Sequence, residues 1–266
     1  VGITVTLPPL QIPLLHPPRP VTALERERYE KNLLIPGIGE AGQARLLAAR
    51  VLVIGAGGLG SPVLFYLAAA GVGTIGIADP DGVASSNLQR QIIHCEDSIG
   101  SAKSHSAATR LAALNSSITV KTYGRITLEF LHEHGREWDL LVDCTDTFDS
   151  KYLIADWCKE SGVPLVWGTA VAMNYQVASF WSAPPAPYPP TSLRSLHPLP
   201  PKPGTTPAAS SVGILGPVAG EAGTIMASEA VKLIAGFGEP LLGRVLVSDA
   251  LKRRTTIVEF AELPGD

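Results

Sequence analysis

Hydrophobic residues follow two different patterns along the chain, and their alternation predicts an α/β fold. Short aliphatic runs typical of buried strands occur at residues 49–55, 74–78, 119–123 and 138–144. Segments with a helical pattern lie between or after them, at 62–70, 102–114, from 128 onwards and at 150–160. Because strands that alternate with helices are joined by crossover connections, we expect a Rossmann-like, mostly parallel sheet with helices on both faces.

The alternation ends in the second half of the chain. Two strand-like segments at 164–170 and 175–181 are separated by only a few residues, which predicts an antiparallel pair. Residues 183–207 contain ten of the 23 prolines and little periodic pattern, so we expect a long, exposed, mobile loop that gates a site. A helix over 213–234 and a final strand pair follow. The parallel sheet should therefore be continued by antiparallel strands.

The first residues are organised differently. Residues 1–23 mix apolar side chains with prolines, which favours an extended N-terminal arm lying on another surface over a helix. Two short helices are predicted between residues 22 and 50, interrupted at Pro36-Gly37. The expected organisation is this arm followed by a single domain over 24–266.

Composition excludes several classes of protein. The chain is 45% hydrophobic and 17% charged with a formal net charge of −3, so no global basic field favours nucleic acid. No apolar run of about 18 residues predicts a membrane span, and no signal peptide is evident, so we expect a cytoplasmic protein. Three cysteines without a C-x-x-C pair predict reduced thiols and no zinc, and the six histidines show no metal-ligand spacing and receive no role.

The first chemical motif is the G-x-G-x-x-G sequence of Gly55, Gly57 and Gly60, with a further glycine at Gly58, placed between a strand and a helix. Such a loop turns tightly, approaches a phosphate chain and presents a helix N-terminus to it. Asp79 ends the next strand, where a carboxylate accepts hydrogen bonds from ribose hydroxyls. These features alone would equally fit the NAD-binding site of a dehydrogenase.

A polar segment then favours a nucleoside triphosphate. Arg90 can contact phosphate oxygens, and Asn87 and Gln91 can donate further hydrogen bonds. Lys103 begins the next helix and would supply a second cation during nucleotidyl transfer. Taken singly, a solvated arginine and a surface lysine are the simpler interpretations, and only their combination after Asp79 is specific.

The sequence Asp-Cys-Thr-Asp at 143–146 follows another predicted strand, at the sheet edge where α/β folds bind their ligands. Asp146 is therefore the candidate to hold Mg²⁺ against a triphosphate. The alternative is that Asp146 caps the helix that starts near Phe148.

These segments together resemble the ThiF/MoeB/HesA family of adenylyltransferases, which are related to ubiquitin-activating enzymes. The resemblance covers roughly residues 28–260 and runs in order through RYEKNLLIPGIGEAGQARL, VLVIGAGGLGSPVLFYLAAAGVGTIGIADPD, SNLQRQIIH, IGSAK, DCTD and GILGPVAGEAGTIMASEAVKLIAG. It implies ATP and Mg²⁺ as cofactors, with Arg90, Lys103 and Asp146 in the reaction and the glycines, Asp79, Asn87 and Gln91 binding the nucleotide.

The resemblance also implies a partner and a reaction. Family members activate the C-terminal carboxylate of a small β-grasp sulfur-carrier protein ending in Gly-Gly, forming an acyl-adenylate and pyrophosphate. They work as homodimers in which an N-terminal arginine reaches the other subunit's site, and here the aligned residue is Lys31. Lysine keeps the charge but loses the bidentate geometry. The loop 183–207 would be the family's crossover loop over the carrier tail.

Two further departures shape the expected chemistry. The zinc-binding C-x-x-C pairs found in many members are missing, and Ala209 stands where some relatives have a catalytic cysteine. The alanine, natural or engineered, excludes a covalent relay through that position. Two alternatives remain beside adenylation of a carrier: a member directed at a peptide or other carboxylate or amide, and a non-catalytic scaffold that binds the carrier. Low positive charge argues against a tRNA substrate.

Overall fold

The computed structural model describes residues 8–202 and 212–261. The strands are β1 Arg50–Ile54, β2 Thr74–Ala78, β3 Thr119–Tyr123, β4 Leu140–Asp143, β5 Leu165–Val171, β6 Asn174–Phe180, β7 Arg244–Asp249 and β8 Arg254–Glu259. The α-helices are α1 Ala23–Arg28, α2 Glu30–Leu33, α3 Gly39–Ala48, α4 Gly60–Ala70, α5 Lys103–Leu114, α6 Leu128–His134, α7 Phe148–Ser161, α8 Leu193–Leu196 and α10 Gly216–Ala235. Short 3₁₀ turns lie at η1 Ser85–Asn87, η2 Glu96–Ser98 and η3 Gly135–Glu137.

The strands form one sheet in the order β3-β2-β1-β4-β5-β6-β7-β8. Neighbouring strands from β3 to β5 pair in parallel, and β5 to β8 pair antiparallel, which confirms the predicted fold class. The chain leaves β1 toward β2 and later returns to the other side of β1 as β4. The loops after β1 and β4 therefore meet at a topological switch point, the usual ligand-binding position in such sheets.

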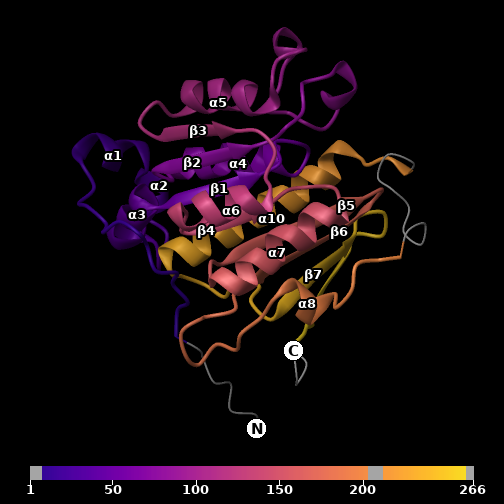
Figure 1. Cartoon of the computed structure of the whole chain (residues 1–266). Helices are drawn as coiled ribbons and strands as arrows, with labels where there is room; N and C mark the ends of the chain where they lie inside the picture. Colours follow the sequence, from indigo (N-terminus) through magenta and orange to yellow (C-terminus); the bar gives the residue numbers. More distant parts are fainter. Residues whose placement is uncertain (1–7, 203–211, 262–266) are drawn as a thin grey trace.

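Helices cover both faces of the sheet (Figure 1). One face packs against α3, α4, α5 and α10 around a large apolar cluster, and the other packs against α6, α7 and α8. The α10 helix crosses behind β4, β5 and β6, so this single helix supports the part of the sheet where parallel pairing changes to antiparallel.

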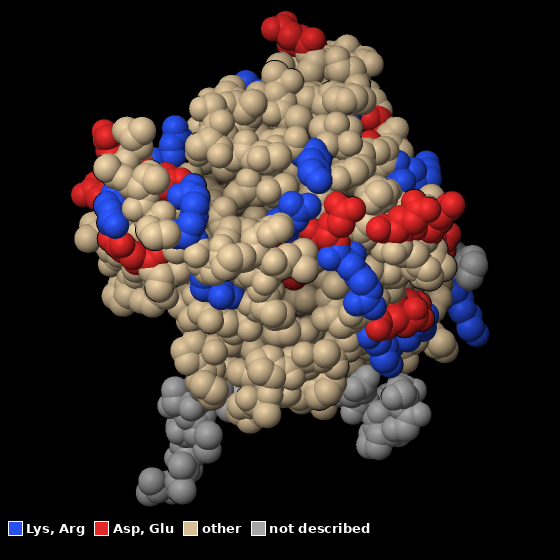
Figure 2. Space-filling model, turned by 60° about the vertical axis from the view of Figure 1, so that its left-hand side comes forward, with Lys and Arg blue, Asp and Glu red and all other residues tan. Residues whose placement is uncertain are grey.

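The surface mixes charges of both signs. On the face seen in Figure 2, basic and acidic side chains lie next to one another rather than in separate fields. Arg26, for example, pairs with Glu40, and Arg253 with Glu221. Among the described helices, none is both long enough and apolar enough to cross a membrane.

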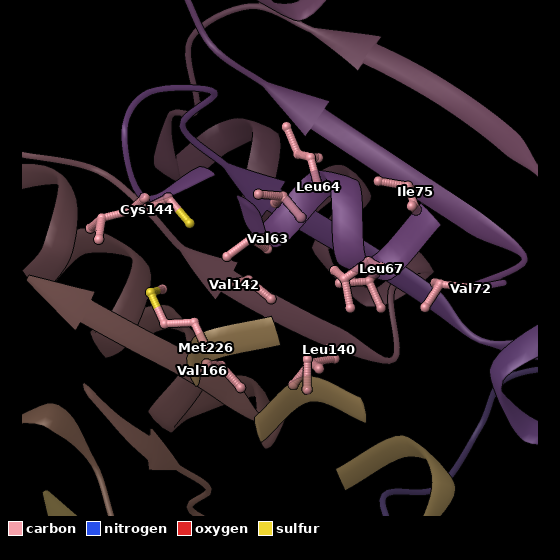
Figure 3. Packing of buried hydrophobic residues seen from close by; sticks show 14 of the residues in the cluster. Val63, Leu64, Leu67, Val72, Ile75, Leu140, Val142, Cys144, Val166 and Met226 are labelled. Carbon is pink, nitrogen blue, oxygen red and sulfur yellow. The ribbon is translucent and has the colours of Figure 1, made fainter. Parts of the chain in front are cut away.

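The larger core lies between α4, α10 and the centre of the sheet (Figure 3). Val63 and Leu67 of α4 pack with Val142 of β4, and Met226 of α10 lies close to Val166 of β5. Gly168 leaves room for this methionine, because a Cβ there would lie 2.3 Å from its sulfur. The core thus fixes α4 and α10 against the strands that carry the loops of the switch point.

The described part of the N-terminal arm packs on its own chain. Ile12 N donates to Leu233 O at 3.0 Å, and the side chains of Leu10 and Ile12 are buried in the larger core. Arg45 of α3 donates through Nε to Ile234 O at 2.6 Å and also contacts Ile12 O. The arm therefore covers the C-terminal end of α10.

The expectation of an exposed proline-rich loop is wrong for its described central part. Thr191, Ser192 and Leu193 are buried, and α8 follows directly. Arg194 forms two 2.7 Å hydrogen bonds with the carboxylate of Asp156 on α7. Prolines restrict the backbone without preventing burial, so a missing helical or strand period did not establish exposure. Residues 203–207 of this loop lie outside the described residues.

His94 supports the loop after β1 from below. Its Nε2 lies 2.9 Å from Ala56 O and its Nδ1 lies 2.9 Å from Ser106 Oγ. Since a carbonyl oxygen only accepts, Nε2 carries a proton, and in the neutral ring Nδ1 accepts from the serine hydroxyl. Burial is the main cause that lowers the pKa of His94, and the nearby charge of Lys103 lowers it further. The hydrogen bond to Ala56 O and the charge of Asp79 raise this pKa, but they do not offset the burial. This histidine, which received no role from the sequence, therefore holds the peptide of Ala56 in place.

We predict a pH-dependent stability contribution from His94. A pKa lowered in the folded state means that neutral His94 stabilises the protein above its ordinary pKa of 6.5, and that this contribution is lost as the pH falls through the lowered value. His94→Gln should lower the unfolding temperature at about pH 8, and the gap to the wild type should narrow toward about pH 5. Thermal unfolding of both proteins across this range measures the difference in unfolding temperature. His197, whose pKa burial also lowers, is present in both proteins and cancels in this difference. A gap that stays constant with pH would contradict the assignment.

Candidate active site

Three loops meet at the carboxyl edge of the parallel strands. Gly55 N donates to Ala78 O at 2.8 Å, and Cys144 N donates to Ile54 O at 2.8 Å. These bonds extend the pairing of β1 with β2 and β4 by one residue beyond the strands. The segments beginning at Gly55, Asp79 and Cys144 consequently lie side by side in fixed register.

The glycine loop is shaped by contacts that exclude side chains. Gly55 has φ +102°, and a Cβ there would lie 2.7 Å from Cys144 O. A Cβ on Gly60 would lie 1.9 Å from Gly55 O, and one on Gly58 would lie 3.1 Å from Ala219 Cβ. At Gly57, by contrast, the nearest atom to a Cβ would be Gln91 Nε2 at 3.5 Å. Gly55 and Gly60 are therefore needed for the turn itself, whereas Gly57 leaves open backbone that a phosphate can approach.

Asp79 has a structural task that the sequence did not indicate. Its carboxylate is buried, and it accepts from Ala56 N at 2.8 Å and from Asp81 N at 2.9 Å. The two backbone polar groups of Ala56 are thus both bound, its N–H by Asp79 and its carbonyl by His94. Each carboxylate oxygen retains a second lone pair, so acceptance from ribose hydroxyls remains compatible with this geometry.

The polar segment after β2 lies against the glycine loop. Arg90 Cγ would be 3.4 Å from a Cβ on Gly58, and Arg90 Nη1 donates to Ser86 O at 3.2 Å. Gln91 is buried beside Gly57, and its Oε1 has no hydrogen-bond partner among the described residues. Asn87 instead uses its Oδ1 to accept from Ala84 N at 3.0 Å within its own turn. The fold therefore brings Arg90 and Gln91 to the loop and gives Asn87 a local role.

Lys103 approaches the site from the first turn of α5. Its side chain is almost fully buried, and Nζ lies 3.1 Å from Asp81 Oδ2, a carboxylate that is itself 63% exposed. The pair joins α5 to the turn that follows Asp79. An anionic ligand would compete with Asp81 for this cation.

Asp146 is exposed at the same edge, and no described residue pairs with its carboxylate. The alternative that Asp146 caps the next helix is wrong, because the side chain of Thr147 accepts from Ser150 N at 3.3 Å and forms the cap of α7. The first aspartate of the same motif, Asp143, is fully buried and pairs with Lys151. Neither Asp143 nor Lys151 was singled out from the sequence.

The structure places Lys31 away from these residues. The hydroxyl of Tyr29 accepts from Asn115 Nδ2 at 2.9 Å, and its ring packs against Gly71, so this segment lies where β2 and β3 begin. The strand β1 of five residues separates this edge from the glycine loop, a distance of about 16 Å at about 3.3 Å per residue. Lys31 is exposed and pairs with its neighbour Glu30 at 3.1 Å. Within one chain it does not contribute to the site.

The N-terminus of α10 borders the site from the other side. A Cβ on Gly216 would lie 2.5 Å from Gln89 O, so the first residue of this helix touches the polar segment that carries Arg90. The hairpin between β5 and β6 holds the preceding residues, since Ala172 N donates to Gly213 O at 2.9 Å. Close backbone contact at the site therefore explains Gly216, whereas Gly213 has open space beside it and a φ of +72°.

The residues present fit a nucleoside triphosphate with Mg²⁺. Open backbone at Gly57 and the guanidinium of Arg90 can bind phosphate oxygens, and the exposed carboxylate of Asp146 at the same edge can hold Mg²⁺. The unpaired buried Oε1 of Gln91 is an acceptor and fits a hydroxyl group of such a ligand. Across residues 8–202 and 212–261, no group of three or more His, Cys, Asp or Glu side chains could hold a metal ion without such a ligand. Burial raises the pKa of the Cys144 and Cys158 thiols, so neither is a thiolate near neutral pH.

Comparison with known proteins finds relatives over most of the chain. The chain is 44% identical to the probable adenylyltransferase/sulfurtransferase MoeZ of Mycobacterium tuberculosis over 99% of its own length and 66% of the relative. It therefore spans slightly less than two thirds of that protein. It is 41% identical to the sulfur carrier protein adenylyltransferase of Thermus thermophilus, covering 87% of this chain and 86% of the relative. The SAMP-activating enzyme E1 of Haloferax volcanii is 39% identical, and the match covers 91% of this chain and 88% of that enzyme.

Solved structures share the fold. The E. coli MccB structure with MccA-N7isoASN superposes with a TM-score of 0.79 at 22% identity, covering 90% of this chain and 73% of that one. The model of the ThiF family matches residues 29–264, which is most of the sequence. The chain therefore belongs to the ThiF family.

Proposed function

We propose that this chain is an ATP-dependent adenylyltransferase that activates the C-terminal carboxylate of a small β-grasp sulfur-carrier protein ending in Gly-Gly. The observation that carries the proposal is the convergence of the glycine loop, Asp79, Arg90 with Gln91, and Asp146 on one sheet edge. Three relatives with names of this kind, two of them adenylyltransferases and one a SAMP-activating enzyme, match over most of the chain at 39–44% identity. The expected location is the cytoplasm.

The proposed reaction forms one bond to phosphorus and breaks another. A carboxylate oxygen of the carrier attacks the α-phosphorus of ATP, and the bond to the departing pyrophosphate breaks, which leaves the acyl-adenylate. The open backbone at Gly57 and the N-terminus of α4 bind the phosphates, while Arg90 and Lys103 offset the charge that develops on them. Asp146 would hold a Mg²⁺ ion, which when bound supplies further charge neutralisation.

The proposed reaction ends at the adenylate. Ala209 lies outside the described residues, and an alanine offers no nucleophile for a thioester or acyl-disulfide. Sulfur transfer then depends on another protein or domain. We also propose that the chain binds no structural zinc, and stoichiometric zinc in the purified protein would contradict this.

The proposal includes a homodimer. Because Lys31 lies at the opposite sheet edge from the glycine loop of its own chain, its cation serves the reaction only from a second copy. The alternative function, a peptide-directed or non-catalytic member that binds a carrier as a scaffold, is favoured by Lys31 and Ala209. Carrier-dependent exchange of pyrophosphate into ATP separates the two.

We predict that Asp146→Ala lowers carrier-dependent ATP–pyrophosphate exchange by about 100-fold, because the carboxylate that holds Mg²⁺ against the triphosphate is lost. The matched control is Asp149→Ala, which removes an exposed carboxylate three residues away in the first turn of α7 and should change exchange by less than about twofold. Bound ATP without any exchange in the wild type, tested with carriers ending in Gly-Gly, would refute adenylation and support the scaffold.

We also predict that two glycine substitutions separate folding from nucleotide binding. Gly57→Ala should change the free energy of unfolding by no more than about 1 kcal/mol, because its Cβ fits, yet weaken ATP binding by about 10-fold. Gly60→Ala should lower the free energy of unfolding by more than about 3 kcal/mol, because the added Cβ would overlap Gly55 O. Denaturant unfolding and calorimetric ATP titration measure the two effects. Unchanged ATP affinity in Gly57→Ala would place the phosphates elsewhere.

A further inference from the structure

A buried ion pair lies directly beneath the loop that carries Asp146. The side chains of Asp143 and Lys151 are 0% and 3% exposed, and Lys151 Nζ lies 3.3 Å from Asp143 Oδ2. Lys151 also donates to Gly168 O on β5 at 2.7 Å, and its ammonium lies 5.4 Å from the centre of the Trp167 ring. The lysine therefore joins α7 to the end of β4 and to the middle of β5.

The second oxygen of Asp143 shapes the loop. Asp143 Oδ1 accepts from Thr145 N at 2.9 Å and from Thr145 Oγ1 at 2.6 Å, which closes a tight turn over residues 143–145. On the other side, Thr147 caps α7. Asp146 thus stands between two residues whose backbones are held, one by the ion pair and one by the helix.

This turn also contacts the glycine loop. The carbonyl of Cys144 occupies the space beside Gly55, and its Cβ would lie 3.7 Å from a Cβ on Gly60. A displacement of the turn would therefore move Asp146 relative to the backbone that faces the phosphates. Small displacements of this kind are costly for a group that must meet a metal and a triphosphate together.

Stability alone is a weak explanation for such a pair. Two charges lose their hydration on burial, and well-packed apolar residues of similar volume often stabilise a protein equally well or better. The chain contains a useful comparison in Glu229 and Lys232 of α10, a second pair with a buried carboxylate, whose lysine also donates to a carbonyl, Glu239 O at 2.9 Å. That pair lies in the C-terminal half of α10, away from the helix end that borders the site.

We propose that Lys151 is a positioning residue that acts through Asp143 and Thr145 to hold Asp146 where it can bind Mg²⁺ with the triphosphate. Lys151 fixes the orientation of the Asp143 carboxylate, that carboxylate fixes the turn at Thr145, and the turn sets the position of Asp146. The inference rests on the proposed function for the identity of the ligand, but the ordering of the turn is a property of the free protein.

The test compares Lys151→Met with Lys232→Met, which removes the lysine of the second pair. Both variants lose stability, but only Lys151→Met should raise the Mg²⁺ concentration for half-maximal ATP–pyrophosphate exchange, by about 10-fold or more. The KM for ATP at saturating Mg²⁺ should change little. An equal Mg²⁺ requirement in the two variants would reduce Lys151 to a structural role and overturn the inference.

A second variant and a second measurement protect the test. Thr145→Val keeps the shape of the side chain and removes only the hydroxyl bond to Asp143, so it should raise the Mg²⁺ requirement even if Lys151→Met fails to fold. Hydrogen–deuterium exchange at the Thr145 amide should be faster in Lys151→Met than in Lys232→Met, without any ligand. Unchanged exchange at this amide overturns the inference. Absence of pyrophosphate incorporation in the wild type overturns only the proposed function, because the amide measurement still tests the turn.

Discussion

The contact between Gly55 and the carbonyl of Cys144 is the constraint on which the site depends. Two neighbouring parallel strands end there, and their loops touch so closely that no side chain fits between them. The contact sets the distance between the phosphate-facing backbone and the loop with Asp146. Gly55 also has a positive φ, so both its backbone conformation and this contact favour glycine at the position. The same close packing continues at Gly60, where α4 begins.

Hydrogen bonds hold the site in shape without a ligand. Asp79 binds the N–H of Ala56 and His94 binds its carbonyl, and Asp143 closes the neighbouring turn. Lys103 is paired with Asp81, a carboxylate that remains largely in water. Asp79 and Lys103 are therefore already oriented by the backbone or by a neighbouring side chain before a nucleotide binds, although a phosphate contact to Lys103 would replace its pairing with Asp81.

Much of this arrangement could be predicted from the sequence. The aliphatic runs, the glycine motif after the first of them and Asp79 at the end of the next predicted the strand–loop–helix order, since these are local patterns in the sequence. The order of the sheet then placed the candidate residues Arg90, Gln91 and Asp146 at one edge. Their predicted roles in binding ATP and Mg²⁺ remain proposals.

The remaining features depend on side-chain contacts in the folded chain, which a local hydrophobic or polar pattern does not encode. His94 meets Ala56 across 38 positions, and the pairing of Asp143 with Lys151 requires that α7 begin where it does. Burial of Leu193 follows from the surface offered by α7 and β6, not from its own neighbours. Lys31 could be assigned to the far edge only after Tyr29 was located against Gly71.

The attachment of α10 at both ends has a mechanical consequence. Its 20 residues make a rod of about 30 Å, which begins against Gln89 at the site and ends under Arg45 and the N-terminal arm. A rod held at both ends resists sliding along its axis, so the first turn of α10 stays in register with the polar segment. Force applied at the arm, by a neighbouring molecule for example, would be transmitted along this helix to the edge of the site some 30 Å away.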